Sequence, residues 1–371
     1  MLAADLLARI RDRAPGYDRD NAFFTEDLAE LRAAGYLAPR SLLETARDQR
    51  LLAAHAPATA LAVNMHHVWV GVARVLHDRG DSSLDWVLED AARGELFAFG
   101  NSEPGNDLVL WDSITRAEEV EGGFAFTGTK IFTSLAPAWT RLGVFGKQED
   151  GPDGPRLVHG FLLRDAAGAD VPGVTTLDDW DTLGMRATSS NTTKLDGAVV
   201  THDKISRFLP VGPNADPFVF GIFANFLLLI GSVYAGIADR ALELGVEAVR
   251  RRTSLKSGLT YDKDPDIRWR LADAALALDA LAPDLESLAA DVDAVADRGA
   301  GWFRALTGAK HRATETARYV VDQAMRVAGG GGYRSSSELA RLQRDVLAGI
   351  YHPSDTESVH ATVASNLLGP L

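Results

Sequence analysis

One stretch near the middle of the chain constrains the fold more than any other. From Phe218 to Ala238 the sequence reads FVFGIFANFLLLIGSVYAGIA, without a charged residue. An apolar run of this length either crosses a bilayer or is buried on all sides in a protein core. Asn225, Ser232 and several glycines interrupt it, and the sequence has no second run of this kind. We therefore expect a helix buried within a large helical domain rather than a membrane span.

The bulk composition restricts the class of protein. At 371 residues, with 46% hydrophobic and 24% charged residues, the chain is expected to be globular and to form two or three domains. Its net charge of -13 argues against nucleic acid as a partner, because phosphate binding requires a basic face. The absence of cysteine excludes disulfides and thiolate sites, and no His, Asp and Glu group has metal-ligand spacing, so we expect no metal. The N-terminal MLAADLLARIRDRAPG reads as an amphipathic helix rather than an export signal, which predicts a cytoplasmic location.

Helical and strand-like patterns divide the chain into three parts. Residues 1–94 read as helices, for example the run FFTEDLAEL that stops at Gly35. Over residues 95–210, Gly and Pro recur, and short runs such as GFAFTG, KIFTS, RLGVFG and LVHGFLL predict an antiparallel β domain. Residues 211–371 return to helices. The predicted fold class is mainly α with a central β domain.

A long apolar stripe marks the last part as a helical bundle. From Pro265, apolar residues at alternating steps of four and three continue through Ile267 and Leu271 to Val295. The stripe crosses Pro283, so we expect one long helix kinked at that proline or two helices nearly in line. Long helices with such seams usually pack together as a bundle.

Four consecutive glycines follow a helical pattern near the C-terminus, in VAGGGGYR at 327–334. Glycine loses more backbone freedom on folding than other residues, so four in succession need a reason. One reason is a helix C-cap followed by a loop. The other is that backbone N–H groups without neighbouring side chains let a large anion approach. The glycines alone do not decide between the two.

Two segments of the β part combine turn signals with polar side chains. GNSEPGNDL at 100–108 lies where the helices give way to strands, and it reads as a site or as an ordinary loop. TGTKIFTSLAP places Lys130, Phe132 and Ser134 on alternating positions of a predicted strand, hence on one face. An aromatic ring beside a small hydroxyl suits a flat ligand with polar edges, and it equally suits a half-buried strand.

Two further segments offer anion contacts. DTLGMRATSSN at 181–191 contains an arginine and several hydroxyls, and such loops bind anions or simply turn. RRRTSLK at 250–256 is a basic cluster in an acidic protein. It either contacts phosphate or stabilises the C-terminal end of a helix.

The order of these parts and motifs resembles the acyl-CoA dehydrogenase superfamily over nearly the whole chain. GTKIFTS is similar to the family's G-x-K-x-W-x-T, LGMRATSSN to LGWRGSxS, AMRVAGGGGYR to AxQxxGGxGY, and RLQRDVLAGIYH to RLYRDxRxxxIYEG. The resemblance implies an N-terminal helical domain at 1–94, a middle β-barrel or sandwich at 95–210, and a C-terminal four-helix bundle at 211–371. It also implies a flavin-dependent oxidoreductase.

The resemblance implies two groups of cofactor-binding residues, with FAD as the cofactor. In the first group Ser102 contacts the flavin, Phe132 lies against the isoalloxazine ring, and Ser134 is near its reactive edge. The second group is expected to reach the phosphates of FAD held by a neighbouring subunit, and it consists of Arg252, Arg326, Gly329 and Gly330. Such sharing requires at least a dimer, and the family is most often a tetramer.

The resemblance also implies contacts with a small-molecule substrate. Arg186 and Ser189 of the LGMRATSSN loop would lie close to cofactor or substrate. Asn106 belongs to a GND triplet, where the family has a GSD that helps to hold coenzyme A. The motif is therefore contracted at this point.

The position of the family's catalytic base departs from the pattern, and three functions follow from it. Most members use the Glu of IYEG, whereas this chain reads Tyr351, His352, Pro353, Ser354, Asp355. The first expectation is α,β-dehydrogenation of an acyl thioester such as an acyl-CoA, with His352 or Asp355 as base, hydride transfer to N5 of FAD, and a flavoprotein electron acceptor. The alternative is a monooxygenase that uses O2 and a reduced flavin, FAD or FMN, supplied by a partner flavin reductase. The third is a catalytically silent member that binds a ligand or partner.

Overall fold

The computed structural model describes the chain except for residues 1, 109, 166–167, 169 and 370–371. Its N-terminal part is helical, as predicted. The helices are α1 (Ala4–Asp20), α2 (Thr25–Ala33), α3 (Leu42–Ala53), α4 (Pro57–His77) and α5 (Asp85–Ala92). The apolar pattern of α2 is buried, with Phe24, Leu28 and Leu31 at most 6% exposed.

The middle of the chain forms one largely antiparallel sheet. Its strands run in the order β6-β7-β3-β2-β4-β5-β8, and β1 lies beside β4. The strands are β1 (Phe97–Gly100), β2 (Arg116–Val120), β3 (Gly123–Lys130), β4 (Arg141–Gln148), β5 (Arg156–Leu163), β6 (Val174–Thr176), β7 (Thr193–Thr201) and β8 (Ile205–Pro210). The pairs β1–β4 and β2–β4 are parallel.

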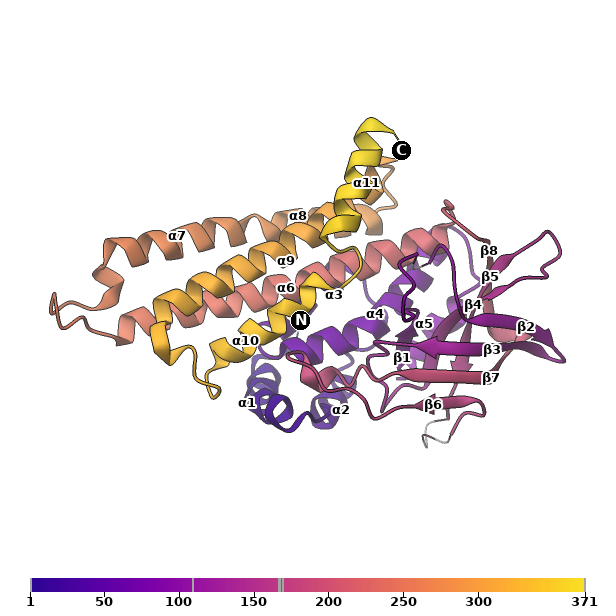
Figure 1. Ribbon diagram of the computed structural model, residues 1–371, viewed down its shortest axis with the longest axis horizontal. Helices are drawn as coiled ribbons and strands as arrows, with labels where there is room; N and C mark the ends of the chain where they lie inside the picture. Colours follow the sequence, from indigo (N-terminus) through magenta and orange to yellow (C-terminus); the bar gives the residue numbers. More distant parts are fainter. Residues whose placement is uncertain (1, 109, 166–167, 169, 370–371) are drawn as a thin grey trace.

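The C-terminal part is helical again. Its long helices are α6 (Pro217–Arg251), α7 (Pro265–Asp279), α8 (Leu281–Asp293) and α9 (Gly301–Ala328), followed by η4 (Gly329–Gly331), α10 (Glu338–Val346), η5 (Leu347–Ile350) and α11 (Thr356–Leu368). Figure 1 shows the bundle of α6 to α9 extending to the left and the sheet closing the right end of the molecule. The mainly α class with a central β region is therefore confirmed.

Helix α6 is the core helix that the uncharged run predicted. Asp216 accepts a hydrogen bond from the backbone N–H of Phe218 at 2.8 Å, and Pro217 occupies the first turn, where its missing N–H costs nothing. Helix α6 packs against α3, α4 and α9. It is long and apolar enough to cross a membrane, yet 83% of its most apolar window is buried inside the protein.

The structure decides one local expectation and contradicts another. The stripe after Pro265 forms two successive helices, and the break falls at Ala280 because Pro283 sits in the first turn of α8, where proline is tolerated. Strand β3 ends at Lys130, so Phe132 and Ser134 do not continue on one strand face. The prediction of a shared face was wrong because the backbone of Phe132 turns into the left-handed region, with φ 56°.

Candidate functional site

The loop after β1 carries the first predicted cofactor residue. The carbonyl of Ser102 accepts a hydrogen bond from the N–H of Ile131 at 2.9 Å, which joins this loop to the turn after β3. Beside it, Asn101 is fully buried, and both polar atoms of its amide lack a hydrogen-bond partner among the residues the structure describes. A buried amide without partners is costly. Asn101 thus marks a place where a polar ligand group or water would be accommodated.

A buried ion pair fixes both of these segments. The side chains of Glu103 and Lys130 are fully buried, with Oε1 and Nζ 2.7 Å apart. Burial opposes ionisation of Glu103, but the nearby Lys130 ammonium and several hydrogen bonds lower the pKa of its carboxyl to about 2. Burial lowers the pKa of Lys130 to about 8. Further donors to the Glu103 carboxylate are the Ser113 hydroxyl, the Asn106 amide, and the N–H groups of Ile114 and Thr115.

Phe132 and Ser134 lie side by side in the turn after β3, with different environments. The ring of Phe132 is 55% exposed, although a bulky residue with positive φ is strained by about 1–2 kcal/mol. Its edge meets Trp180, with the ring centroids 6.2 Å apart. Ser134 is buried, and its Oγ lies 2.8 Å from Oγ of Ser190. A strained and exposed aromatic residue is typical of a binding surface.

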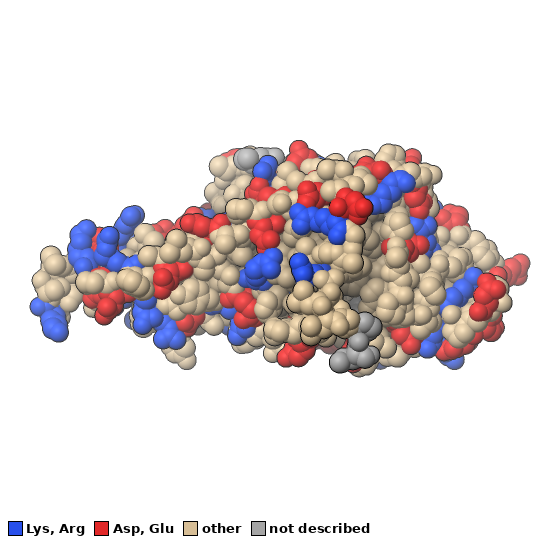
Figure 2. Space-filling view, turned by 90° about the horizontal axis from the view of Figure 1, so that it is seen from above, with Lys and Arg blue, Asp and Glu red and all other residues tan. Residues whose placement is uncertain are grey.

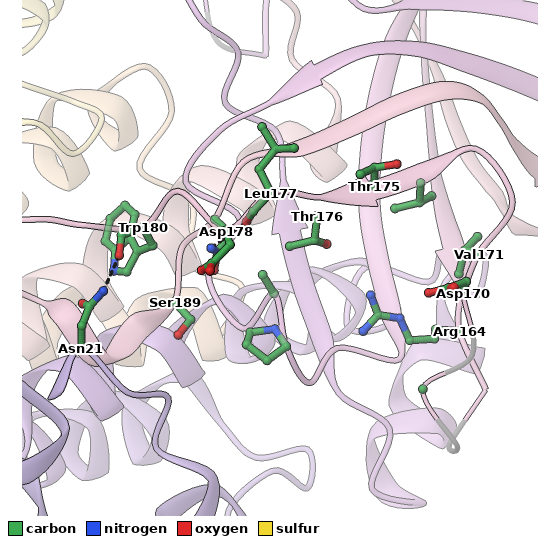
Figure 3. Close-up of a pocket in the computed structure, with 15 residues that line it drawn as sticks. Asn21, Arg164, Asp170, Val171, Thr175, Thr176, Leu177, Asp178, Trp180 and Ser189 are labelled. Carbon is green, nitrogen blue, oxygen red and sulfur yellow. Dashed lines mark hydrogen bonds between the residues drawn. The ribbon is translucent and has the colours of Figure 1, made fainter.

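Of the predicted substrate residues, Ser189 borders a cavity. This cavity has a volume of about 660 Å³ and lies beside β6. In Figure 3 its lining runs from Asn21 and Trp180 at one end to Arg164 at the other, with Ser189 between them. The neighbouring Ser190 bonds Ser134, so the 189–191 segment connects the lining of the cavity with that hydroxyl.

Arg186 and Asn106 are engaged within the protein. The guanidinium of Arg186 donates to the carbonyl of Asp18 at 2.8 Å and to the Asp181 carboxylate at 3.0 Å, which ties the loop to α1. The amide of Asn106 donates to Glu103 and to the carbonyl of Asp112, at 2.7 and 3.0 Å, and its oxygen accepts from a backbone N–H of the same loop. Their roles in substrate binding remain predictions.

The second predicted cofactor group lies at the other end of the bundle. The Arg252 guanidinium donates to the carbonyls of Val327 and Ala328, at 3.1 and 2.7 Å, and among the described residues no carboxylate pairs with it. Gly329 lies against it with φ 63°, whereas a Cβ on Gly330 would meet nothing within 4 Å. This end of the molecule, on the left in Figure 2, carries a gathering of basic side chains.

Arg326 does not join that group. Its side chain is 58% exposed and pairs with Asp322 one turn earlier on α9, with Nε and Oδ2 2.7 Å apart. The structure therefore brings Arg252 and Gly329 together and leaves Arg326 on the surface of the helix.

The two predicted catalytic residues have different environments. His352 follows η5, and its ring centroid lies 5.8 Å from that of Tyr234 on α6. Its Nε2 and the Tyr234 hydroxyl are buried, and neither has a partner among the described residues. Burial, assisted by the charge of Lys310, lowers the pKa of His352 to about 3, so the imidazole is neutral.

Asp355 is the N-cap of α11. Its carboxylate accepts a hydrogen bond from the N–H of Ser358 at 2.9 Å, and hydrogen bonds from Ser358 lower its pKa. A carboxylate held in this way is a weak base. In the described part of the chain, no group of three or more His, Cys, Asp or Glu side chains is arranged to hold a metal ion.

Sequence reasoning missed four residues of these sites: Asn101, Glu103, Tyr234 and Lys310. Glu103 was open to prediction, since it is a charged residue within a segment that must be partly buried. Asn101, Tyr234 and Lys310 are surrounded in space by residues from distant parts of the chain. No local sequence pattern identifies them.

Comparisons with known proteins identify a family model and relatives that this chain resembles. Residues 228–354 match the family model described as acyl-CoA dehydrogenase, C-terminal domain. The amino sugar nitrososynthase DnmZ of Streptomyces peucetius is 31% identical over 65% of this chain and 58% of its own length. The chain thus spans little more than half of that relative.

Two further relatives cover more of both chains. A dibenzothiophene monooxygenase of Mycolicibacterium goodii is 29% identical over 72% of this chain and 66% of its own. The solved structure of KijD3 in complex with FMN and dTDP-3-amino-2,3,6-trideoxy-4-keto-3-methyl-D-glucose superposes with a TM-score of 0.84 at 25% identity, over 99% of this chain and 92% of that one.

Proposed function

Because this chain belongs to the acyl-CoA dehydrogenase superfamily, we propose that a bound flavin supports its chemistry and that the reaction is a monooxygenation of a small molecule. Acyl-thioester dehydrogenation was the first expectation, and the monooxygenase alternative now takes its place. The similar proteins include a nitrososynthase and a monooxygenase, so they favour the monooxygenase alternative over acyl-thioester dehydrogenation.

The observation that carries the proposal is the state of His352. Removal of an α proton requires a base whose pKa lies near the working pH. The pKa of His352 is lowered to about 3, mainly by burial, and the Asp355 carboxylate is occupied as a helix cap. A neutral imidazole with an unpartnered Nε2 is a poor proton acceptor, but it can exchange a hydrogen bond with a polar group on substrate or cofactor.

The residues of this chain fit a flavin in two places. The exposed ring of Phe132 offers a surface for a flat ring system, and Ser134 stands beside it. Arg252, with no carboxylate partner among the described residues, and the open backbone at Gly330 suit a phosphate or diphosphate. When bound in reduced form, FMN or FAD supplies the two electrons and the activation of O2 that a monooxygenation needs.

The two places lie in different parts of one chain, because Phe132 follows strand β3 of the sheet and Arg252 lies at the end of the bundle away from the sheet (Figure 1). Helix α6 has 35 residues, so it is about 50 Å long at 1.5 Å per residue. Its first residue lies near the sheet and its last precedes Arg252 at the far end of the bundle (Figure 1). A single flavin therefore contacts both groups only if they come from different copies of the chain. We propose a homo-oligomer in which Arg252 of one copy serves the flavin held beside Phe132 of another.

The proposed reaction inserts one oxygen atom of O2 into the substrate, at an amine nitrogen or a sulfur atom. The second oxygen atom leaves as water, with the two electrons and two protons that the reduced flavin brings. In this scheme His352 and Tyr234 orient the reacting group and hold a proton at His352 Nε2 or the Tyr234 hydroxyl. A partner reductase regenerates the reduced flavin.

The test is oxygen incorporation. The purified protein, a flavin reductase, NADH, FMN or FAD and ¹⁸O₂ are incubated with a primary alkylamine, a TDP-amino sugar, a thioether and an acyl-CoA. We expect one ¹⁸O atom in a nitrogen or sulfur compound. His352→Ala should abolish the insertion and leave flavin binding unchanged, whereas His360→Ala, at an exposed position on α11, should behave as wild type.

Two results would contradict the proposal. One is anaerobic bleaching of the FAD-loaded protein by an acyl-CoA, with an enoyl product, which restores the dehydrogenase interpretation. The other is wild-type oxygen insertion by His352→Ala, which removes that residue from the mechanism.

A further inference from the structure

One buried lysine holds the segment on which His352 sits. Lys310 projects from α9 and is 1% exposed. Its Nζ donates to the backbone carbonyls of Gly349, His352 and Ser354, at 3.1, 2.9 and 2.9 Å. An ammonium group has three N–H donors, so all of them are used on this one segment.

The arrangement is unusual because the charge has no ion-pair partner. Among the residues that the structure describes, no carboxylate lies within ion-pair distance of Lys310. A buried charge is normally paired, since desolvation of a lone charge is costly. Three carbonyl dipoles aimed at one ammonium replace the missing carboxylate. They also fix the backbone at three points within six residues, from Gly349 to Ser354.

The segment held by Lys310 is also packed tightly against Tyr234 and Thr314. A Cβ on Gly349 would lie 2.9 Å from Cε1 of Tyr234 and 3.1 Å from Cγ2 of Thr314. The Tyr234 ring, in turn, faces His352, with the ring centroids 5.8 Å apart. Movement of the segment therefore changes the position of the imidazole relative to the Tyr234 hydroxyl.

We propose that Lys310 is a positioning residue, which sets the place of the His352 imidazole by holding the carbonyls of residues 349, 352 and 354. The consequence for turnover rests on the proposed function, in which His352 orients the reacting group. The three hydrogen bonds from Lys310, called the clamp below, hold the backbone whether or not the protein is turning over substrate. Their effect on the backbone is therefore tested without an activity assay.

The protonation of Lys310 gives the clamp a pH dependence. The groups that face it are Asp355 at the start of α11, Glu315 and His311 on α9, and His352 and Tyr234 across the interface. Burial lowers the pKa of Lys310 to about 8, while the charges of Asp355 and Glu315 oppose that shift. Below about pH 8 all three donors are present. Above it one donor is lost, and a lone pair faces a carbonyl oxygen.

The experiment compares Lys310→Met and Lys310→Arg with Thr314→Val. Among the residues that the structure describes, the Thr314 hydroxyl bonds only carbonyls of α9, at Lys310 and His311, so Thr314→Val keeps the shape next to Gly349 and leaves the clamp intact. The first readout is hydrogen exchange of peptides covering residues 347–356 in the full-length protein. In Lys310→Met we expect at least about tenfold faster exchange there, the factor expected for one charge-assisted hydrogen bond, and unchanged exchange in the rest of the protein.

The second readout is the titration of the His352 ring by NMR. Loss of the neighbouring positive charge should raise its pKa in Lys310→Met, and Lys310→Arg should restore the low value. The third is turnover, where a misplaced group lowers kcat by about 10- to 100-fold while flavin affinity is kept. The alkaline loss of activity near pH 8 should disappear in Lys310→Arg if that variant is active.

The outcomes separate the two proposals. Unchanged exchange over residues 347–356 and an unchanged His352 pKa in folded Lys310→Met would overturn the positioning role. If both change while the wild-type protein inserts no oxygen into any compound, the clamp stands and the proposed function fails. If Lys310→Met does not fold, Lys310→Arg decides by its exchange and its pH profile: wild-type behaviour in both overturns the proposal.

Discussion

The buried pair of Glu103 and Lys130 yields the sharpest prediction. Glu103→Gln removes the negative charge with little change of shape and leaves the Lys130 ammonium buried, with only neutral acceptors, the introduced amide oxygen and the Phe145 carbonyl at 2.7 Å. Replacing one partner of a buried ion pair costs about 3–5 kcal/mol, because the remaining charge is uncompensated. Removing one partner of an exposed ion pair elsewhere on the protein has a much smaller effect on the free energy of unfolding.

Deprotonation of Lys130 limits this loss of stability. The lysine can always release its proton, and from an unfolded pKa of 10.5 this costs about 1.4 kcal/mol per pH unit, or about 5 kcal/mol at pH 7. The unfolded variant then binds a proton that the folded variant lacks, so its stability rises with pH. In the wild type Lys130 keeps its proton up to about pH 8. The deficit of the variant should therefore shrink as pH rises to about 8, and the two stabilities should run parallel above it.

The assay is urea unfolding of wild type and variant at pH values between about 6 and 9, followed by circular dichroism. Glu118→Gln is the matched control, since Glu118 is an exposed carboxylate on β2 and its loss should change stability by less than about 0.5 kcal/mol. A loss below about 1 kcal/mol at pH 7 for Glu103→Gln, or a loss that grows with pH, would show that the pair is not buried as described.

Three further predictions concern the candidate sites. Phe132→Ala should change the unfolding free energy by less than about 1 kcal/mol, because the ring is half exposed, yet weaken flavin binding at least about tenfold in a fluorescence titration; unchanged affinity would remove Phe132 from the flavin site. Gly330→Val should melt within a few degrees of wild type, because its Cβ points into open space, but should bind flavin more weakly than wild type in the same titration, whereas wild-type affinity would contradict the phosphate role. Asp355→Ala should cost about 1 kcal/mol through the lost N-cap of α11, measured by unfolding, and should keep its turnover if Asp355 is not the base.

The fold was largely predictable because its main elements have strong local patterns. The uncharged run fixed the core position of α6, and the stripe after Pro265 indicated the paired helices α7 and α8. Strands with buried faces, such as β4 and β5, were also found. Strand β2 was missed because RAEEV is mostly polar and exposed, and it is a strand only through its pairing with β3 and β4.

The site was less predictable, since it depends on contacts between distant segments. The alternation at Lys130, Phe132 and Ser134 failed because one residue with positive φ ends the strand. The three carbonyls held by Lys310 come from residues about forty positions later, and backbone groups leave no trace in a sequence. Motif resemblance located His352 without showing that burial makes it a weak base.

The dependence of α6 on its neighbours has a consequence for biosynthesis. Its partners α3 and α4 leave the ribosome before it, but α9 begins only at Gly301, after α7 and α8. During that interval one side of a helix that is apolar enough to cross a membrane is uncovered. Nascent chains of this protein that pause before α9 is complete should therefore recruit chaperones or membrane-targeting factors. Substitutions that weaken the α6–α9 interface should reduce yield in cells more than they reduce the stability of the finished protein.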